Sequence, residues 1–242
     1  GNEGIGFAIP SNLALEIGEQ LIEKGRVVRG FLGVYAQNLT ASLAKQFDMP
    51  ADSRGALITG VESNSPASRA GIRVGDIITS VEGKRITSSR DLMMQVEGTS
   101  PGTKVSIGIL RDGTKETLPA TLGQLPSAPT ETSTAAVAPP PAQNEALAGV
   151  AVSDLTPALR KELKVPSTID GAVITEVAAG SDAYRAGLRP GDVIEQIDRK
   201  PVTSAREAVR IGKSIKKDHP ALLLVWSEGV SLFVVVKTAR PG

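Results

Sequence analysis

Hydrophobic positions along the chain fall into short runs that are separated by polar turns. Four apolar, β-branched-rich runs stand out, at residues 56–61, 104–110, 222–226 and 230–237. Runs of this length and composition predict β-strands. Arg-Asp-Gly-Thr at 111–114 and Ser-Glu-Gly-Val at 227–230 are typical of hairpin turns between the last two strands of each half.

Three other segments have a helical pattern, at residues 13–25, 88–97 and 204–215, and each has polar residues suited to an N-cap at its start. In the first of them, Leu13, Ile17 and Leu21 follow Pro10-Ser11-Asn12 with the spacing of one helix face. The pattern as a whole predicts a mostly β protein with a few helices, of the α+β class.

The two halves of the chain align without a gap at a constant offset of 116 residues. SPASRAGIRVGDIITS from Ser65 lies over SDAYRAGLRPGDVIEQ from Ser181, and roughly two in five positions are identical over about 60 residues. Two copies are too few for a solenoid, so this predicts a tandem of independent domains. Each copy is expected to be a small, partly open β-barrel or sandwich with a helix packed against it.

A stretch rich in Pro, Ala, Ser and Thr separates the copies. It contains almost no large apolar residue and includes Pro139-Pro140-Pro141, which favours extended polyproline geometry. We therefore predict an unpacked linker that is semi-rigid in this part. The predicted organisation is an N-terminal segment at 1–25, a first domain at 26–122, a linker at 123–145 and a second domain at 146–242.

Composition excludes several classes of function. The chain has 242 residues with 27 Lys+Arg, 26 Asp+Glu and a net charge of +1, and 3% of its residues are aromatic. The weak net charge and the scarcity of stacking side chains argue against nucleic acid as a partner. No apolar run reaches the roughly 18 residues of a membrane span, so we expect no membrane insertion.

Catalytic and metal-ligating residues are also scarce. The chain has no Cys, which excludes disulfides, thiolate metal sites and Cys nucleophiles. Its single His, His219, precedes Pro220 in a turn region and lies in no nucleophile or ligand motif, and one His does not make a metal site. We expect no metal, no cofactor and no enzymatic activity in this chain, which we interpret as a cut-out or processed piece because it opens Gly1-Asn2-Glu3.

RAGIRVGDII at residues 69–78, repeated as RAGLRPGDVI at 185–194, resembles the signature of PDZ domains. The roles of these residues are structural. Gly71 and Gly75 allow backbone conformations that a Cβ would penalise, and Asp76 is suited to accept hydrogen bonds from turn amides. The phrase therefore predicts the fold of each copy, and the function must lie elsewhere.

The segment RGFLGVY at residues 29–35 resembles the carboxylate-binding loop of a PDZ domain. Successive backbone N–H groups in such a loop can converge on a terminal carboxylate, and the following strand can accept an extended peptide. Three residues on one face of the 88–97 helix would form the opposite wall. The predicted site comprises Arg29, Gly30, Phe31, Leu32, Gly33, Val34, Tyr35, Ser89, Met93 and Val96, with Phe31 as the floor of the pocket.

Plainer interpretations of the same residues stay open. Gly33 could mark an ordinary bend at the start of a strand, with Phe31 and Met93 as core residues. Arg29 could neutralise a ligand carboxylate or be a solvated flank. In the second copy the matching positions are Leu147, Ala148, Gly149, Val150, Ala205 and Val209, which predict a shallower pocket that is either a weak peptide site or a docking spacer.

Two such copies with a Pro-rich linker, preceded by GIGFAIPS at residues 4–11, resemble the HtrA/Deg family of periplasmic serine proteases. The resemblance implies that residues 1–25 are the last strand of a protease domain with its connecting helix, and that the Gly-Asn-Ser-Gly-Gly nucleophile segment of the family is missing here. It implies a periplasmic location, and binding of apolar C-terminal segments of misfolded proteins for a protease domain within an oligomer. The alternative is an assembly module whose PDZ copies bind each other or neighbouring subunits.

Overall fold

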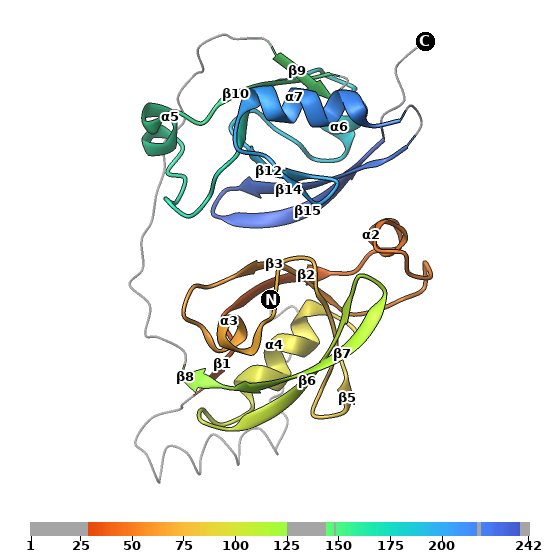
Figure 1. Cartoon of the computed structure of the whole chain (residues 1–242), viewed down its shortest axis with the longest axis vertical. Coiled ribbons are helices and arrows are strands. Elements are labelled where there is room, and N and C mark those ends of the chain that lie inside the picture. Colours follow the sequence, from red (N-terminus) through yellow and green to blue (C-terminus); the bar gives the residue numbers. More distant parts are fainter. Residues whose placement is uncertain (1–28, 125–143, 148, 217–218, 238–242) are drawn as a thin grey trace, which may run out of the picture.

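The computed structural model describes residues 29–124, 144–147, 149–216 and 219–237. These form two domains, which are joined through residues 125–143 (Figure 1). Both domains consist mainly of antiparallel strands with short helices, so the predicted mostly β, α+β class is confirmed. The helix expected over residues 13–25 and most of the expected linker lie outside the described residues.

The first domain is built on an open sheet with strand order β2-β3-β4-β6-β7, in which β5 also pairs with β4. A separate short pair joins β1 to β8. In chain order the elements are β1 (Gly30–Phe31), β2 (Val34–Asn38), α2 (Ala41–Gln46), β3 (Ala56–Val61), α3 (Pro66–Ala70), β4 (Ile77–Val81), β5 (Lys84–Arg85), α4 (Ser89–Glu97), β6 (Lys104–Arg111), β7 (Thr114–Thr121) and β8 (Gly123–Gln124).

The second domain repeats this plan in an open sheet with strand order β15-β14-β12-β11-β10-β9, and β13 pairs with β12. Its elements are β9 (Asn144–Leu147), β10 (Val150–Asp154), α5 (Pro157–Glu162), β11 (Ala172–Val177), α6 (Asp182–Arg185), β12 (Val193–Ile197), β13 (Lys200–Pro201), α7 (Ala205–Ser214), β14 (Ala221–Ser227) and β15 (Val230–Val236). Even the irregularities recur, because the register shift between Tyr35 and Ala36 has its counterpart between Ala151 and Val152.

Local sequence explains where the helices begin. In the first domain, the hydroxyls of Thr40, Ser65 and Ser88 each accept a hydrogen bond from the backbone N–H three residues later. Thr156, Ser181 and Ser204 do the same in the second domain. Such N-caps satisfy amides that have no partner inside the helix, so these six positions fix the helix starts in both copies.

The Gly-Asp pair of the repeated signature has the expected structural role. Gly75 has φ +92°, and the buried Asp76 accepts a hydrogen bond of 2.8 Å from the Arg73 amide. In the second domain Asp192 makes the same 2.8 Å bond with the Arg189 amide. The signature thus closes the turn that leads into β4 and β12, as its sequence predicts.

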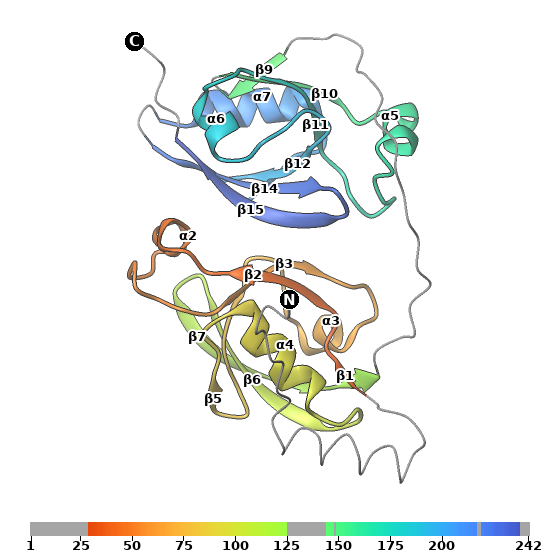
Figure 2. The ribbon, with the colours of Figure 1, turned by 180° about the vertical axis from the view of Figure 1, so that it is seen from behind.

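Each domain has its own apolar core, and a third apolar cluster joins the two domains. Leu43 and Phe47, in and after α2, pack with Leu222 and Phe233 of β14 and β15. The rings of Phe47 and Phe233 meet edge to face with centroids 5.6 Å apart. Figure 2, which shows the molecule from behind, places β14 and β15 opposite α2, β2 and β3. The second domain therefore covers apolar surface that the first domain would otherwise expose.

Polar contacts surround this interdomain cluster. The Gln37 side chain bonds to the backbone of Phe233 in both directions, accepting from its N–H at 2.7 Å and donating to its carbonyl at 3.2 Å. Arg199 forms an ion pair of 2.8 Å with Asp112, and its guanidinium lies 4.5 Å from the centre of the Phe47 ring. Gln37 thereby satisfies part of the backbone of β15, which is the edge strand of its sheet.

Both ends of the predicted linker carry strands. Gly123–Gln124 pairs with β1, and Asn144–Leu147 pairs with β10. Ordered backbone pairing thus reaches into residues 123–145 from each side, and the domain boundaries given above stay predictions. No helix within the described ranges is long and apolar enough to cross a membrane.

Candidate functional site

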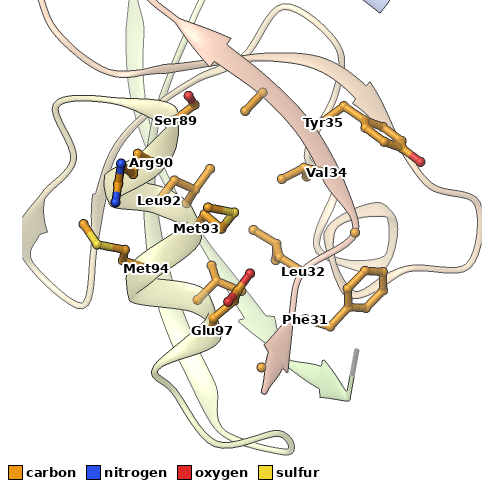
Figure 3. Close-up of a pocket in the computed structure, with 14 residues that line it drawn as sticks. Phe31, Leu32, Val34, Tyr35, Ser89, Arg90, Leu92, Met93, Met94 and Glu97 are labelled. Atoms are coloured by element: carbon orange, nitrogen blue, oxygen red, sulfur yellow. The ribbon is translucent and has the colours of Figure 1, made fainter. Parts of the chain in front are cut away.

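A groove with a volume of about 590 Å³ lies between β2 and α4 of the first domain (Figure 3). Its surface is mainly apolar, with β1, the loop after it and β2 on one side and α4 on the other. It is lined by Gly30, Phe31, Leu32, Gly33, Val34, Tyr35, Ala36, Ser89, Arg90, Leu92, Met93, Met94, Val96 and Glu97. The structure thus brings together at this groove every residue of the predicted first site except Arg29.

The loop that enters β2 is held in a conformation that requires glycine. Gly33 has φ +78°, and a Cβ placed on it would lie 2.3 Å from the Cβ of Ser65. The carbonyl oxygens of Leu32 and Gly33 accept hydrogen bonds from the amides of Ala67, at 2.8 Å, and Glu62, at 3.0 Å. The loop is therefore anchored through its carbonyl groups to the segment that contains α3.

Side chains of the groove divide into a buried floor and an exposed wall. Leu32, Leu92 and Val96 are buried in the domain core, whereas Met93 and Met94 are 54% and 55% exposed. Large exposed apolar side chains beside a groove mark binding surfaces, and Met adapts its shape to different partners. The Met93 side chain points toward β2, and the Met94 side chain points away from it (Figure 3).

The two aromatic residues of the predicted site lie at its margin. A Cβ on Gly33 would meet the Phe31 ring at 3.2 Å and one on Gly123 would meet it at 3.6 Å, so this ring lies beside the loop. Leu32 points into the groove and occupies the place at its floor that we expected for Phe31 (Figure 3). Tyr35 points away from α4, and its pKa is raised by partial burial and by the nearby Glu62 carboxylate.

Arg29 lies just outside the groove and forms an ion pair of 3.3 Å with Glu97 of α4. Both side chains are partly solvated, with 58% and 31% exposure, so the pair contributes little to stability. Because Glu97 lines the groove, its negative charge partly offsets the positive charge that Arg29 brings to this end. An anion bound here would depend mainly on the backbone amides of the loop.

A hydrogen-bonded side chain joins the far end of β2 to α4. The Asn38 Oδ1 atom accepts from the Ser89 amide at 2.9 Å and from the Ser89 hydroxyl at 3.0 Å. In the second domain, Asp154 accepts from the Ala205 amide at 2.7 Å. This bond sets the distance between strand and helix in both copies, and in the first it engages the Ser89 hydroxyl.

Sequence reasoning missed five residues of the groove, namely Ala36, Arg90, Leu92, Met94 and Glu97. Three of them had a usable signal. Leu92 lies three residues after Ser89 on the helix face already chosen, and Ala36 continues β2. Glu97 lies four residues after Met93 and so borders the same face. Arg90 and Met94 had a weaker signal, since their place at the rim depends on how α4 is tilted against the sheet.

The predicted residues of the second site are positioned differently. Leu147, Val150 and Ala205 are buried in the core of the second domain, and Val209 is packed against that core. Gly149 has φ +81°, which matches Gly33, whereas Ala148 lies outside the described residues. In addition, β9 pairs with one edge of β10. The corresponding edge of β2 in the first domain faces the groove.

Other chemistry is sparse in the described parts of the chain. His219 lies in the loop between α7 and β14, where its amide donates to the Lys216 carbonyl at 3.1 Å. No group of three or more His, Cys, Asp or Glu in these parts has the arrangement of a metal site.

Comparison with known proteins gives a consistent picture. Residues 30–122 and 173–227 each match a family model of the PDZ domain, and neither match is to a protease domain. The probable periplasmic serine endoprotease DegP-like of Pseudomonas fulva (strain 12-X) is 36% identical over 237 residues, which cover 98% of this chain and 48% of that protein. The protein of the same name from Chlamydia trachomatis serovar D is 36% identical over 235 residues, covering 97% of this chain and 45% of the relative.

Solved structures of similar sequence include the HtrA-type protease AlgW with decapeptide, with 41% identity and a TM-score of 0.46 over 52% of this chain and 38% of that one. The chain spans about half the length of the curated relatives it matches. It contains two PDZ domains, called PDZ1 and PDZ2 below. The chain therefore belongs to the HtrA/Deg family of serine proteases, of which it represents the tandem PDZ part.

Proposed function

We propose that PDZ1 binds the free C-terminal end of extended, apolar peptide segments, which add to β2 as a further strand. The main support is one observation. Among the described residues β2 pairs with β3 alone, and its other edge borders an apolar groove that ends at the Gly33 loop. An extended peptide would bond to the free edge, and loop amides would hold its carboxylate.

The wider role follows from the family. Relatives are named as periplasmic serine endoproteases, so we propose that this chain is the substrate-recognition and regulatory arm of such a hydrolase in the periplasm. Misfolded proteins with exposed apolar C-terminal segments are its proposed substrates, because folded proteins rarely expose such segments. The protease domain and other subunits of the parent oligomer are its further proposed partners.

The groove also sets an expected affinity. Burial of about 250 Å² of apolar ligand surface would contribute on the order of 6 kcal/mol. Ordering the peptide and losing its translational freedom subtract several kcal/mol. We therefore expect dissociation constants from roughly micromolar to sub-millimolar. Binding of this strength allows the release of one chain end and the capture of the next.

Fluorescence anisotropy with a labelled ten-residue peptide tests the proposal, with an apolar last residue and either a free or an amidated C-terminus. We expect amidation to weaken binding at least about tenfold, since it removes a charged acceptor for the loop amides. Met93→Asp should weaken binding about tenfold, whereas Met94→Asp, at a neighbouring and equally exposed position that points away from β2, should change it less than about twofold. Equal binding of the two peptides would exclude carboxylate capture.

A role in assembly is the second candidate, and the apolar contact between PDZ1 and PDZ2 favours it. The surfaces around Phe47 and Phe233 already bind each other within the chain, and the same surfaces could pair between two chains. Sedimentation over a hundredfold concentration range tests this role. A monomer throughout would exclude it, and a dimer that Phe233→Ala dissociates would support it.

A further inference from the structure

In PDZ2, the strand edge that corresponds to the groove edge of PDZ1 is paired with a strand of the same chain. β10 pairs with β11 along one edge, and β9 (Asn144–Leu147) pairs antiparallel along the other. By the repeat offset, β10 corresponds to β2 of PDZ1 and α7 corresponds to α4. Figure 1 and Figure 2 both show β9 next to α7 and β10. The edge that faces an open groove in PDZ1 is therefore already hydrogen-bonded in PDZ2.

The direction of β9 is that expected of a bound peptide. Its last residue, Leu147, lies opposite Val150 at the start of β10, and Asn144 lies opposite Val152. An external ligand would also run antiparallel to the strand, with its terminal apolar residue next to the glycine loop. Leu147 is 5% exposed and belongs to the PDZ2 core. It thus takes the place that the terminal side chain of a ligand would have.

Helix α7 is adapted to a strand that lies close to it. Ala205 and Ala208 stand where α4 has Ser89 and Leu92, and both alanines are buried. Val209 and Gly212 likewise replace Met93 and Val96. Small side chains let a backbone approach a helix closely, so this face leaves room for β9 but offers little apolar wall to a separate ligand.

PDZ1 uses the corresponding segment in another way. Gly30 and Phe31, the equivalents of Ala146 and Leu147, pair with β8 instead of β2. A Cβ on Gly30 would lie 2.2 Å from the Val96 carbonyl oxygen, so glycine lets this segment pass under the end of α4. The segment is thereby drawn away from the groove in PDZ1, where β3 is the only described strand that pairs with β2.

We propose that β9 is an internal ligand of PDZ2, which occupies the peptide groove so that an external strand can bind only after β9 has left it. An attached segment competes at a high effective concentration. If β9 is bound for nine-tenths of the time, the apparent affinity of an external peptide falls about tenfold. This inference concerns PDZ2 alone and does not depend on peptide capture by PDZ1.

Cysteine pairing tests the position of β9, because the chain contains no Cys of its own. Glu145 and Ala151 are register partners, and opposite residues of an antiparallel pair are close enough for a disulfide. The double variant Glu145→Cys with Ala151→Cys should form an intramolecular disulfide under mild oxidation. Glu145→Cys with Tyr35→Cys is the matched control, since Tyr35 is the PDZ1 equivalent of Ala151. Equal rates of disulfide formation in the two pairs would overturn the proposal.

Peptide titration followed by NMR on the β10 amides tests the consequence, in a Gly33→Ala background that silences PDZ1. In the oxidised double variant Glu145→Cys with Ala151→Cys, added peptide should cause no chemical-shift changes in the β10 amides. Replacement of Asn144, Glu145 and Ala146 by Gly, Ser and Gly should instead make peptide binding at β10 at least about tenfold tighter than in the protein with native β9. Leu147 is kept so that the PDZ2 core stays filled. Equal binding by the locked and the substituted proteins, or no binding by the substituted one, would overturn the proposal.

Discussion

PDZ1 and PDZ2 share a framework down to their helix caps and strand irregularities, but their grooves differ. In PDZ1, an apolar groove lined by Leu32, Met93 and Val96 lies beside an edge of β2 with which no described strand pairs. In PDZ2, the corresponding edge carries β9, and α7 presents small residues. A duplicated fold can thus keep its turns and core while one copy changes its binding site. The structural differences between the copies are concentrated in the segment before the glycine loop and in one helix face.

The copies also differ in how they accommodate the buried carboxylate of the signature. In PDZ1, Asp76 forms an ion pair with Arg111, whose Nε and terminal nitrogen lie 2.8 and 2.7 Å from its two oxygens. In PDZ2, Ser227 stands at the equivalent position, and burial raises the pKa of Asp192. The hydrogen bonds from Ser227 and Arg189 lower that pKa but do not cancel the effect of burial. Within the described ranges, the carboxylate of this turn is therefore ion-paired in PDZ1 alone.

The largest expected difference between the copies concerns the glycine loops. Gly33→Ala should weaken binding of an apolar peptide with a free C-terminus by about a hundredfold, because the strained φ and the contact with Ser65 distort the loop. Gly149→Ala should leave this affinity within about twofold, since the PDZ2 groove holds β9. Calorimetric titration measures both. Comparable losses in the two variants would show that both grooves capture peptide.

The next largest effect concerns the ion pair of the buried Asp76 in PDZ1, which Asp192 in PDZ2 does not share. Arg111→Ser should lower the free energy of unfolding of PDZ1 by about 3 kcal/mol, because it leaves Asp76 buried without its ion pair. Hydrogen exchange of the β4 and β6 amides measures the change, and Trp226 fluorescence reports PDZ2 separately as an internal reference. Arg85→Ser, on the exposed β5, should cost less than about 0.5 kcal/mol. Similar results for the two variants would contradict this assignment.

A smaller effect is expected at the junction of strand and helix in PDZ1. Asn38→Ala should weaken peptide binding about fivefold, because it removes both bonds that hold Ser89 at a fixed distance from β2. Asn38→Asp, the residue found at this position in PDZ2, should restore most of the affinity. A simple loss of stability would lower the melting temperature without this pattern of rescue. If Asn38→Ala binds normally, the groove width does not depend on this residue.

The smallest expected effect is a difference between PDZ1 and PDZ2 in how their stability depends on pH. Burial raises the pKa values of Asp192 and Glu195 in PDZ2. A carboxyl group whose pKa is higher in the folded state adds stability below its unfolded pKa, and this contribution is lost as the pH rises through its folded pKa. Lowering the pH from neutral should therefore stabilise PDZ2 relative to PDZ1. Melting temperatures between pH 7 and pH 5 measure this.

Two exposed carboxylates have lowered pKa values and therefore favour stability at higher pH, but one lies in each domain, so their effects cancel when PDZ1 and PDZ2 are compared. Hydrogen bonds from Thr87 and Thr203 lower the pKa values of Asp91 in PDZ1 and of Glu207 in PDZ2. These residues are equivalents in the repeat, so their contributions change alike with pH. Asp192→Asn should remove most of the stability that PDZ2 gains relative to PDZ1 when the pH is lowered. If that variant keeps the full gain in stability, Asp192 is not its source.

The fold was predictable because its signals are local and occur twice. The repeat offset, the caps at Ser88 and Ser204 and the Gly-Asp turn each act within a few residues, so sequence alone indicates them. The floor of the groove was harder to predict. Phe31 and Leu32 are adjacent and both apolar, and which of them points into the groove depends on the course of β1 toward β8.

The role of β9 was not predictable from the sequence. Asn144 and Glu145 lie at the end of a low-complexity segment whose composition favours an unpacked chain. Their pairing with β10 arises from a tight turn at Gly149 and from the small residues of α7, which matter only once the domain has folded. The shallower pocket expected for PDZ2 reflects the same small residues, but not the strand that they accommodate.

The most direct test of the central claim is the number of peptide sites on the intact chain. Calorimetric titration with an apolar peptide that has a free C-terminus should give one site per chain, and Gly33→Ala should remove it. Two sites of similar affinity, or one site that survives in Gly33→Ala and is lost in Gly149→Ala, would contradict the account of an open PDZ1 and a self-occupied PDZ2.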